Sequence, residues 1–148
     1  MRAELRVGVD IAAPAQLVWD VVTSWERQGE WIPFTRVRRL PGPHGTVGEH
    51  VLARTALGPL GFDDLMTVTA WEPPSRCLVE HTGRVVRGSG EFGVQPQGAG
   101  SRFTWSEVVS VPGGRLAPLL WRIAAPPLRL GFGVALRRLK RVVENEDR

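Results

Sequence analysis

Two ionisable side chains, Glu107 and His81, lie on predicted strand faces that are otherwise apolar. In the stretch "RFTWSEVVSV" (102–111), alternate side chains share a face, and Glu107 is the one charged residue on the apolar face. His81 belongs in the same way to the apolar face of "RCLVEHT" (76–82). A carboxylate and an imidazole in an apolar setting can exchange protons with a ligand or orient it.

Each of these side chains also has a purely structural interpretation. Buried carboxylates are usually paired, so Glu107 would then be held by an arginine, an indole N–H or water. His81 would be a core histidine bonded to the backbone. One further strand is expected between the two, which places their backbones roughly 10 Å apart. The sequence therefore leaves open whether Glu107 and His81 meet.

Other site chemistries are not indicated by the sequence. "GSGEFG" (88–93) matches GxGxxG, but it lies within a predicted strand, whereas a dinucleotide site needs this motif between a strand and a helix. The three histidines and the single cysteine, Cys77, lack the spacing of metal ligands. No recognisable nucleophile motif is present. We therefore expect no metal and no other cofactor.

Hydrophobic periodicity predicts the elements that position the two residues. "ELRVGVDI" (4–11) alternates as a strand, and "APAQLVWDVVTSW" (13–25) has a helical stripe. Thr23 and Glu26 have capping-box spacing for a second short helix, "WERQGEWI" (25–32). Six further strands with short turns follow between Phe34 and Val111, which favours an antiparallel meander.

A long helix is predicted to close the chain from Gly113 onward. Its apolar stripe must cover the inner face of the sheet, because no other predicted element is long enough to do so. Pro126 and Pro127 are expected to break or kink the helix. The stripe consists of Leu128, Phe132, Leu136, Leu139 and Val143.

Length and composition indicate a single globular domain over residues 1–148. The chain is 43% hydrophobic and 23% charged, and it has no repeat or clear linker. One cysteine fits a reducing compartment, and "MRAELRVGVD" carries charge where a signal peptide needs an apolar run, so we expect a cytoplasmic protein. No nucleic-acid recognition motif accompanies the net charge of +4, so no nucleic-acid partner is expected.

Four segments together resemble the START-like superfamily, also called the SRPBCC or polyketide cyclase/dehydrase-like group. The segments are "VDIAAPAQLVWDVVTSWERQGEWIP" (9–33), "FDDLMTVTAWEPPSRCLVEH" (62–81), "SRFTWSEVV" (101–109) and the closing "LRRLKRVVE" (136–144). The resemblance implies an α+β helix-grip fold, as in the birch pollen allergen. A curved seven-stranded antiparallel sheet wraps a long C-terminal helix in this fold, and two short helices lie between strands 1 and 2.

In such a fold the space between the sheet and the long helix is a cavity, and strand parity predicts which residues line it. Parity leaves two sets open on "FDDLMTVTAW" (62–71), one containing Asp64, Met66 and Val68 and the other containing Leu65 and Trp71. Glycine inside a strand marks a bulge or the close approach of a ligand. The predicted lining, besides His81 and Glu107, is Met66, Val68, Val79, Gly88, Gly90, Phe92, Phe103, Trp105, Leu128 and Phe132.

Two functions follow from this prediction. The first is binding of a small lipophilic molecule of polyketide, fatty acyl or isoprenoid type in the internal cavity. The alternative is a polyketide cyclase, aromatase or dehydratase that uses Glu107 and His81 for proton transfer. The resemblance supplies no catalytic motif that would decide between a binding protein and an enzyme.

The last helix carries a basic cluster that is a candidate for peripheral contact with an anionic membrane. The cluster otherwise forms a solvated helix face. The apolar run from Leu116 to Leu136 is long enough to span a bilayer, but Arg122, Arg129 and three prolines argue against a transmembrane segment. Pro126 and Pro127 either bend this helix or form a gate over the mouth of the cavity. The cluster consists of Arg137, Arg138, Lys140 and Arg141.

Overall fold

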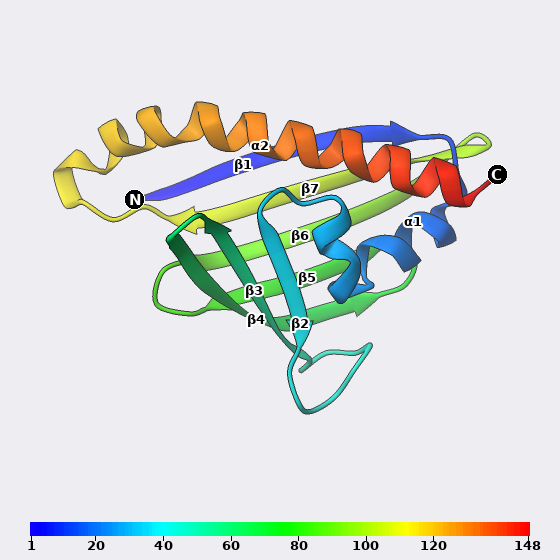
Figure 1. Cartoon of the computed structure of the whole chain (residues 1–148), viewed down its shortest axis with the longest axis horizontal. Helices are drawn as coiled ribbons and strands as arrows, with labels where there is room; N and C mark the ends of the chain where they lie inside the picture. Colours follow the sequence, from blue (N-terminus) through cyan, green and yellow to red (C-terminus); the bar gives the residue numbers. More distant parts are fainter.

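A computed structural model describes all 148 residues of the chain, Met1–Arg148 (Figure 1). It has seven strands, two α-helices and two short 3₁₀ helices, and apart from the second 3₁₀ helix their order is the one predicted from the sequence. The elements are β1 (Arg2–Ile11), α1 (Ala15–Val22), η1 (Trp25–Glu30), β2 (Thr35–Arg39), β3 (His50–Leu57), β4 (Leu60–Glu72), β5 (Arg76–Thr82), β6 (Arg87–Gln97), β7 (Gly100–Ser110), η2 (Gly114–Leu116) and α2 (Ala117–Glu146).

All seven strands form one antiparallel sheet in the order β1-β7-β6-β5-β4-β3-β2. Strands β2 to β7 form a meander, and β7, the last strand, pairs with β1, which is the edge strand on that side of the sheet. Helix α1 and η1 connect β1 at this edge with β2 at the opposite edge, and α2 runs alongside β1 (Figure 1). The predicted helix-grip fold, with its two short helices between strands 1 and 2, is therefore confirmed.

The two halves of α2 have different environments. In the C-terminal half, Ala135, Leu136, Leu139 and Val143 are buried in the main core. In the N-terminal half only Ala117 and Ala125 are buried. The core is therefore closely packed at the end of the sheet that α1, η1 and the C-terminal half of α2 cover.

Helix α2 continues through Pro126 and Pro127, so the expected break does not occur. A proline lacks the N–H that would bond the carbonyl four residues earlier. The two carbonyls concerned belong to Arg122 and Ile123, which are exposed, so water can hydrate them.

Two local expectations from the sequence are also corrected. Thr23 does not cap the second short helix: its hydroxyl donates to the carbonyl of Trp19 at 2.7 Å, and this helix, η1, is a 3₁₀ helix that begins after Ser24. On β4, the register shifts between Val68 and Ala70. Before this bulge, Met66 and Val68 face the core. After the bulge the facing is reversed, and Trp71 packs against the core. Each of the two parity sets is therefore correct for one part of the strand.

The contrast between the halves of α2 leads to a stability prediction. Leu139 is fully buried, so Leu139→Ala should lower the free energy of unfolding by about 2–5 kcal/mol. Leu130 is 67% exposed in the other half, and Leu130→Ala should change this free energy by less than about 0.5 kcal/mol. Urea unfolding followed by circular dichroism measures both values. Equal losses would contradict the conclusion that the C-terminal half of α2 packs in the core and the N-terminal half does not.

Candidate ligand-binding site

A cavity of about 550 Å³ lies between the sheet and the N-terminal half of α2. Its walls come from β1 at Leu5, β3 to β7 with the β5–β6 turn, the segment from η1 to β2, and α2 from Trp121 to Ala135. Of its 31 lining residues, 18 are hydrophobic. This size and composition are typical of sites for small, mainly apolar molecules.

Nine of the twelve residues predicted to line the cavity do so. Val68 and Phe103 do not, because both are in the solid core, where Phe103 packs on Phe92 at a centroid distance of 5.3 Å. Gly88 does not line it either. The nine are Met66, Val79, His81, Gly90, Phe92, Trp105, Glu107, Leu128 and Phe132.

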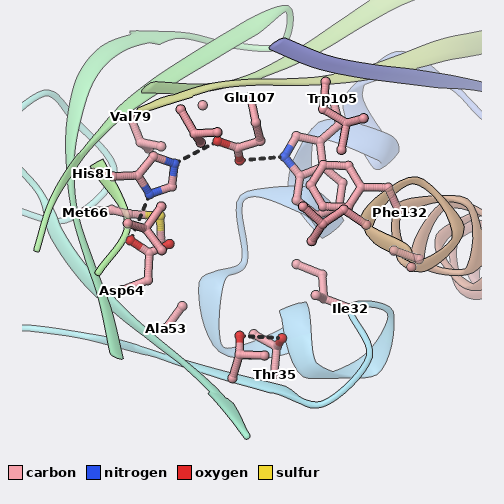
Figure 2. A pocket seen from close by; sticks show the side chains of 18 of the residues that line it. Ile32, Thr35, Ala53, Asp64, Met66, Val79, His81, Trp105, Glu107 and Phe132 are labelled. Atoms are coloured by element: carbon pink, nitrogen blue, oxygen red, sulfur yellow. Dashed lines mark hydrogen bonds and ion pairs between the residues drawn. The ribbon is translucent and has the colours of Figure 1, made fainter. Parts of the chain in front are cut away.

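His81 lies between two carboxylates in the wall of the cavity (Figure 2). Its Nδ1 is 2.8 Å from Oδ1 of Asp64 on β4, and its Nε2 is 2.7 Å from Oε2 of Glu107 on β7. The side chain of His81 is only 4% exposed, and those of Asp64 and Glu107 are 14% and 15% exposed. Glu107 and His81 therefore do meet, and Asp64 completes a linear chain of three charged groups.

Glycines on β6 allow this contact across an intervening strand. Gly90 is the register partner of Glu107 on one side, and Gly88 is the partner of His81 on the other. A Cβ added to Gly90 would lie 2.8 Å from Oε1 of Glu107, so this glycine leaves the space that the carboxylate occupies. Gly88 has φ of +137° and lies against the backbone of Val108, so it serves the strand geometry and makes no room for a ligand.

The aromatic wall holds the other oxygen of Glu107. The indole Nε1 of Trp105 donates to Oε1 of Glu107 at 3.0 Å, while Oε2 accepts from His81. The Trp105 ring in turn stacks on Phe132 of α2, with a centroid distance of 4.1 Å and an interplanar angle of 8° (Figure 2). Both oxygens of Glu107 thus have donors, which explains how a carboxylate is tolerated on this apolar strand face.

His81 is a cation at neutral pH. Burial alone would lower its pKa, but the hydrogen bonds and the attraction of Asp64 and Glu107 outweigh this effect and raise the pKa to about 10. A doubly protonated ring also fits the geometry, because each ring nitrogen then donates to a carboxylate. One cation between two carboxylates leaves the cluster with a net charge of about −1.

Sequence reasoning included Asp64 among possible lining residues but did not recognise its pairing with His81. It missed Glu49 altogether, a fully buried carboxylate outside the cavity. Oε1 of Glu49 accepts from Trp25 at 3.2 Å and from the backbone of Gly45 at 2.8 Å, and Oε2 lies 3.2 Å from Nε of Arg39. Glu49 therefore holds the loop between β2 and β3 against η1. No group of three or more His, Cys, Asp or Glu residues is arranged to hold a metal ion.

The chain belongs to the family described as "Polyketide cyclase / dehydrase and lipid transport", which matches residues 2–144. No curated protein matches it in sequence. Among solved structures, it resembles the protein TTHA0849 of Thermus thermophilus, with a TM-score of 0.83 and 14% identity over 99% of this chain and 100% of that one. It also resembles the Zhui aromatase/cyclase of Streptomyces sp. R1128, with a TM-score of 0.78 and 16% identity over 100% and 97% of the two chains.

A third similar structure is the protein named Ara h 8.0201, with a TM-score of 0.69 and 14% identity over 97% of this chain and 98% of that one. At these identities the likeness extends to the fold alone. Together with the family match, it establishes the START-like assignment that the sequence predicted.

The charged cluster leads to a prediction on the pH dependence of stability. The folded pKa of His81 lies above its usual value of 6.5, so its stabilising effect is complete below pH 6.5 and is lost as the pH rises toward 10. Between pH 6.5 and 8.5 the free energy of unfolding should fall by up to about 1.4 kcal/mol per pH unit. Burial raises the pKa of Cys77 from 9.0 to about 12, so its own effect on stability begins only as the pH approaches 9. Denaturant unfolding of the His81→Gln variant should lack this slope, and an unchanged slope would contradict the assignment.

A second prediction concerns the glycine gap. Gly90→Ala should push the Glu107 carboxylate away from His81, so the pKa of His81 should fall by about one pH unit or more, as expected for a lost hydrogen bond to a charged group. NMR titration of the His81 ring measures this value. Gly131→Ala is the control, because a Cβ at Gly131 meets no atom within 4 Å. The same His81 pKa in wild type and Gly90→Ala would refute the role of the gap.

Proposed function

We propose that the chain binds a small lipophilic molecule, of polyketide, fatty acyl or isoprenoid type, in the cavity between the sheet and α2. The observation that carries the proposal is the cavity itself: about 550 Å³ of mainly apolar space with one charged cluster in its wall. An apolar molecule gains from leaving water for such a space, and a few polar groups then fix its orientation.

The hydrogen bonds of the cluster favour a ligand whose buried end carries a neutral hydroxyl group. Both ring nitrogens of His81 already donate, and both oxygens of Glu107 already accept. Oδ2 of Asp64 accepts no hydrogen bond, so a phenol, enol or alcohol can donate to it. The net negative charge of the cluster would repel a buried carboxylate, whereas an acidic end can lie beside Arg87, which also lines the cavity.

An enzymatic role as a polyketide cyclase, aromatase or dehydratase is the second candidate. A carboxylate–imidazole pair inside the cavity and the likeness to structures named aromatase/cyclase support it. The charge state supports it less, because a histidine with a pKa of about 10 keeps its proton at neutral pH and a general base works best with a pKa near the working pH. Ligand binding is therefore the stronger proposal.

Cavity-filling variants test the binding proposal. Gly131 lines the cavity and has open space at its Cβ position, so the side chain introduced by Gly131→Phe should occupy part of the cavity. We predict at least a tenfold loss of affinity for the neutral fluorescent probe N-phenyl-1-naphthylamine. Gly133→Phe is the matched control, because Gly133 is on the same helix but does not line the cavity, and it should keep the wild-type affinity.

The outcome that would contradict the proposal is equal probe affinity in both variants, or no binding by the wild type. Native mass spectrometry of the purified protein is an independent readout, since a tightly bound natural ligand would add its mass to the wild type and not to Gly131→Phe. For the enzymatic candidate, Glu107→Gln keeps the size of the side chain but removes its charge. If a polyketide-like substrate is turned over, a proton-transfer role requires a fall in kcat of about 10²-fold or more, and unchanged kcat excludes this role.

A further inference from the structure

The N-terminal half of α2, together with η2 before it, exposes a continuous aliphatic surface. The segment Gly114–Glu146 is long and apolar enough to cross a membrane, yet only 17% of its most apolar window is buried. A large group of exposed apolar side chains normally marks an interaction surface. The large aliphatic side chains at the surface, each 44–67% exposed, are Leu116, Leu119, Leu120, Ile123, Leu128 and Leu130.

Arginines and aliphatic residues follow the same seven-residue spacing in this segment. Leu116, Ile123 and Leu130 are each preceded directly by an arginine, at positions 115, 122 and 129. Seven residues make nearly two helical turns, so the three aliphatic residues form one row and the three arginines form a second row beside it. The opposite side, with Ala117 and Ala125, faces the protein. The segment thus presents an outward aliphatic row flanked by guanidinium groups.

Other exposed apolar residues surround the mouth of the cavity. Phe34, Val85 and Leu128 are each at least 44% exposed and line this same cavity. Leu57 and Leu60 face each other across the β3–β4 turn and are 65% and 76% exposed. In Figure 1 the β3–β4 turn, the β5–β6 turn and the start of α2 all lie toward the left end of the molecule.

The charges of the N-terminal half of α2 and of the β5–β6 turn are all positive, and the exposed Asp63 near the β3–β4 turn is paired with Arg54. The sequence has no aspartate or glutamate between Ser110 and Val143, and the exposed Arg84 and Arg87 add positive charge at the β5–β6 turn. A second copy of the chain packed on this surface would bring rows of arginines together, which repel each other. An anionic lipid surface instead attracts the arginines and accepts the aliphatic side chains.

We propose that the N-terminal half of α2 and the rim of the cavity form a docking surface for an anionic lipid bilayer. The segment lies along the bilayer and does not cross it, because Leu139 and Val143 of the same helix are fully buried against the sheet. Docking brings the mouth of the cavity to the lipid, but the proposal does not depend on the cavity binding a ligand. It differs from the sequence expectation, which assigned membrane contact to the basic cluster at 137–141. There, Lys140 is paired with Glu144, and acidic residues follow at 146 and 147.

Vesicle co-sedimentation tests the proposal. The wild type should bind phosphatidylcholine vesicles that contain phosphatidylglycerol, bind phosphatidylcholine alone much more weakly, and be released by high salt. Replacing arginines 115, 122 and 129 together with Gln should lower the affinity by on the order of 100-fold, at about fivefold for each charge. Replacing arginines 137, 138 and 141 together with Gln removes the same charge elsewhere on the helix and should change the affinity by only a few-fold.

Equal losses in the two triple variants would overturn the proposal, as would the absence of vesicle binding by the wild type. The alternative is that a second copy of the chain binds this surface, and sedimentation velocity tests it. A dimer of the wild type that Ile123→Gln dissociates would assign the surface to a second copy and overturn the proposal. A dye at Ile123→Cys gives the location directly, because Cys77 is buried and should remain unlabelled. Its emission should shift to the blue on addition of anionic vesicles, whereas a dye at Asn145→Cys should not respond. Equal responses at the two positions would also overturn the proposal.

Discussion

The site depends on one arrangement, in which a protonated His81 lies between the carboxylates of Asp64 and Glu107 inside an apolar wall. Each of these groups alone would be costly to bury, because an unpaired charge loses its hydration. Together they satisfy one another, and Trp105 supplies the remaining donor to Glu107. The arrangement requires that β6 has no side chain in the gap, and Gly90 meets this requirement. A single glycine on one strand thereby leaves the space for the charged cluster in the cavity wall.

The cavity exists because the sheet and α2 pack closely along only part of their length. Where α1, η1 and the C-terminal half of α2 meet the sheet, tryptophans and branched aliphatic residues fill the interior. In the N-terminal half of α2 the only buried side chains are those of Ala117 and Ala125, Trp121 and Leu128 border the cavity, and most of the large aliphatic residues are exposed. The same distribution that leaves the interior hollow therefore makes the outer surface apolar. The proposed internal binding and the proposed surface docking both rest on this one sequence pattern.

The sequence predicted the fold well because periodicity and turn residues act locally. The seven strands, the two short helices and the long helix all follow from such signals. Strand parity placed seven of ten strand candidates in the cavity wall, and the helical stripe placed Leu128 and Phe132 there. Two kinds of feature could not be predicted from the sequence. Depth along a strand is not encoded in parity, so Val68 and Phe103 were assigned to the cavity although they lie in the core. The contact between His81 and Glu107 depends on what the intervening strand leaves out, which a spacing of roughly 10 Å between backbones does not reveal.

The account rests on the claim that the cavity accepts an apolar molecule and that the charged cluster orients it. A crystal structure of the wild type soaked with 1-naphthol, a neutral and hydroxylated bicyclic molecule, tests this claim most directly. The account predicts electron density for the rings between Trp105, Phe132 and Met66, with the hydroxyl within hydrogen-bond distance of Asp64. Side chains collapsed into the interior, or a naphthol bound only at the outer surface, would contradict it.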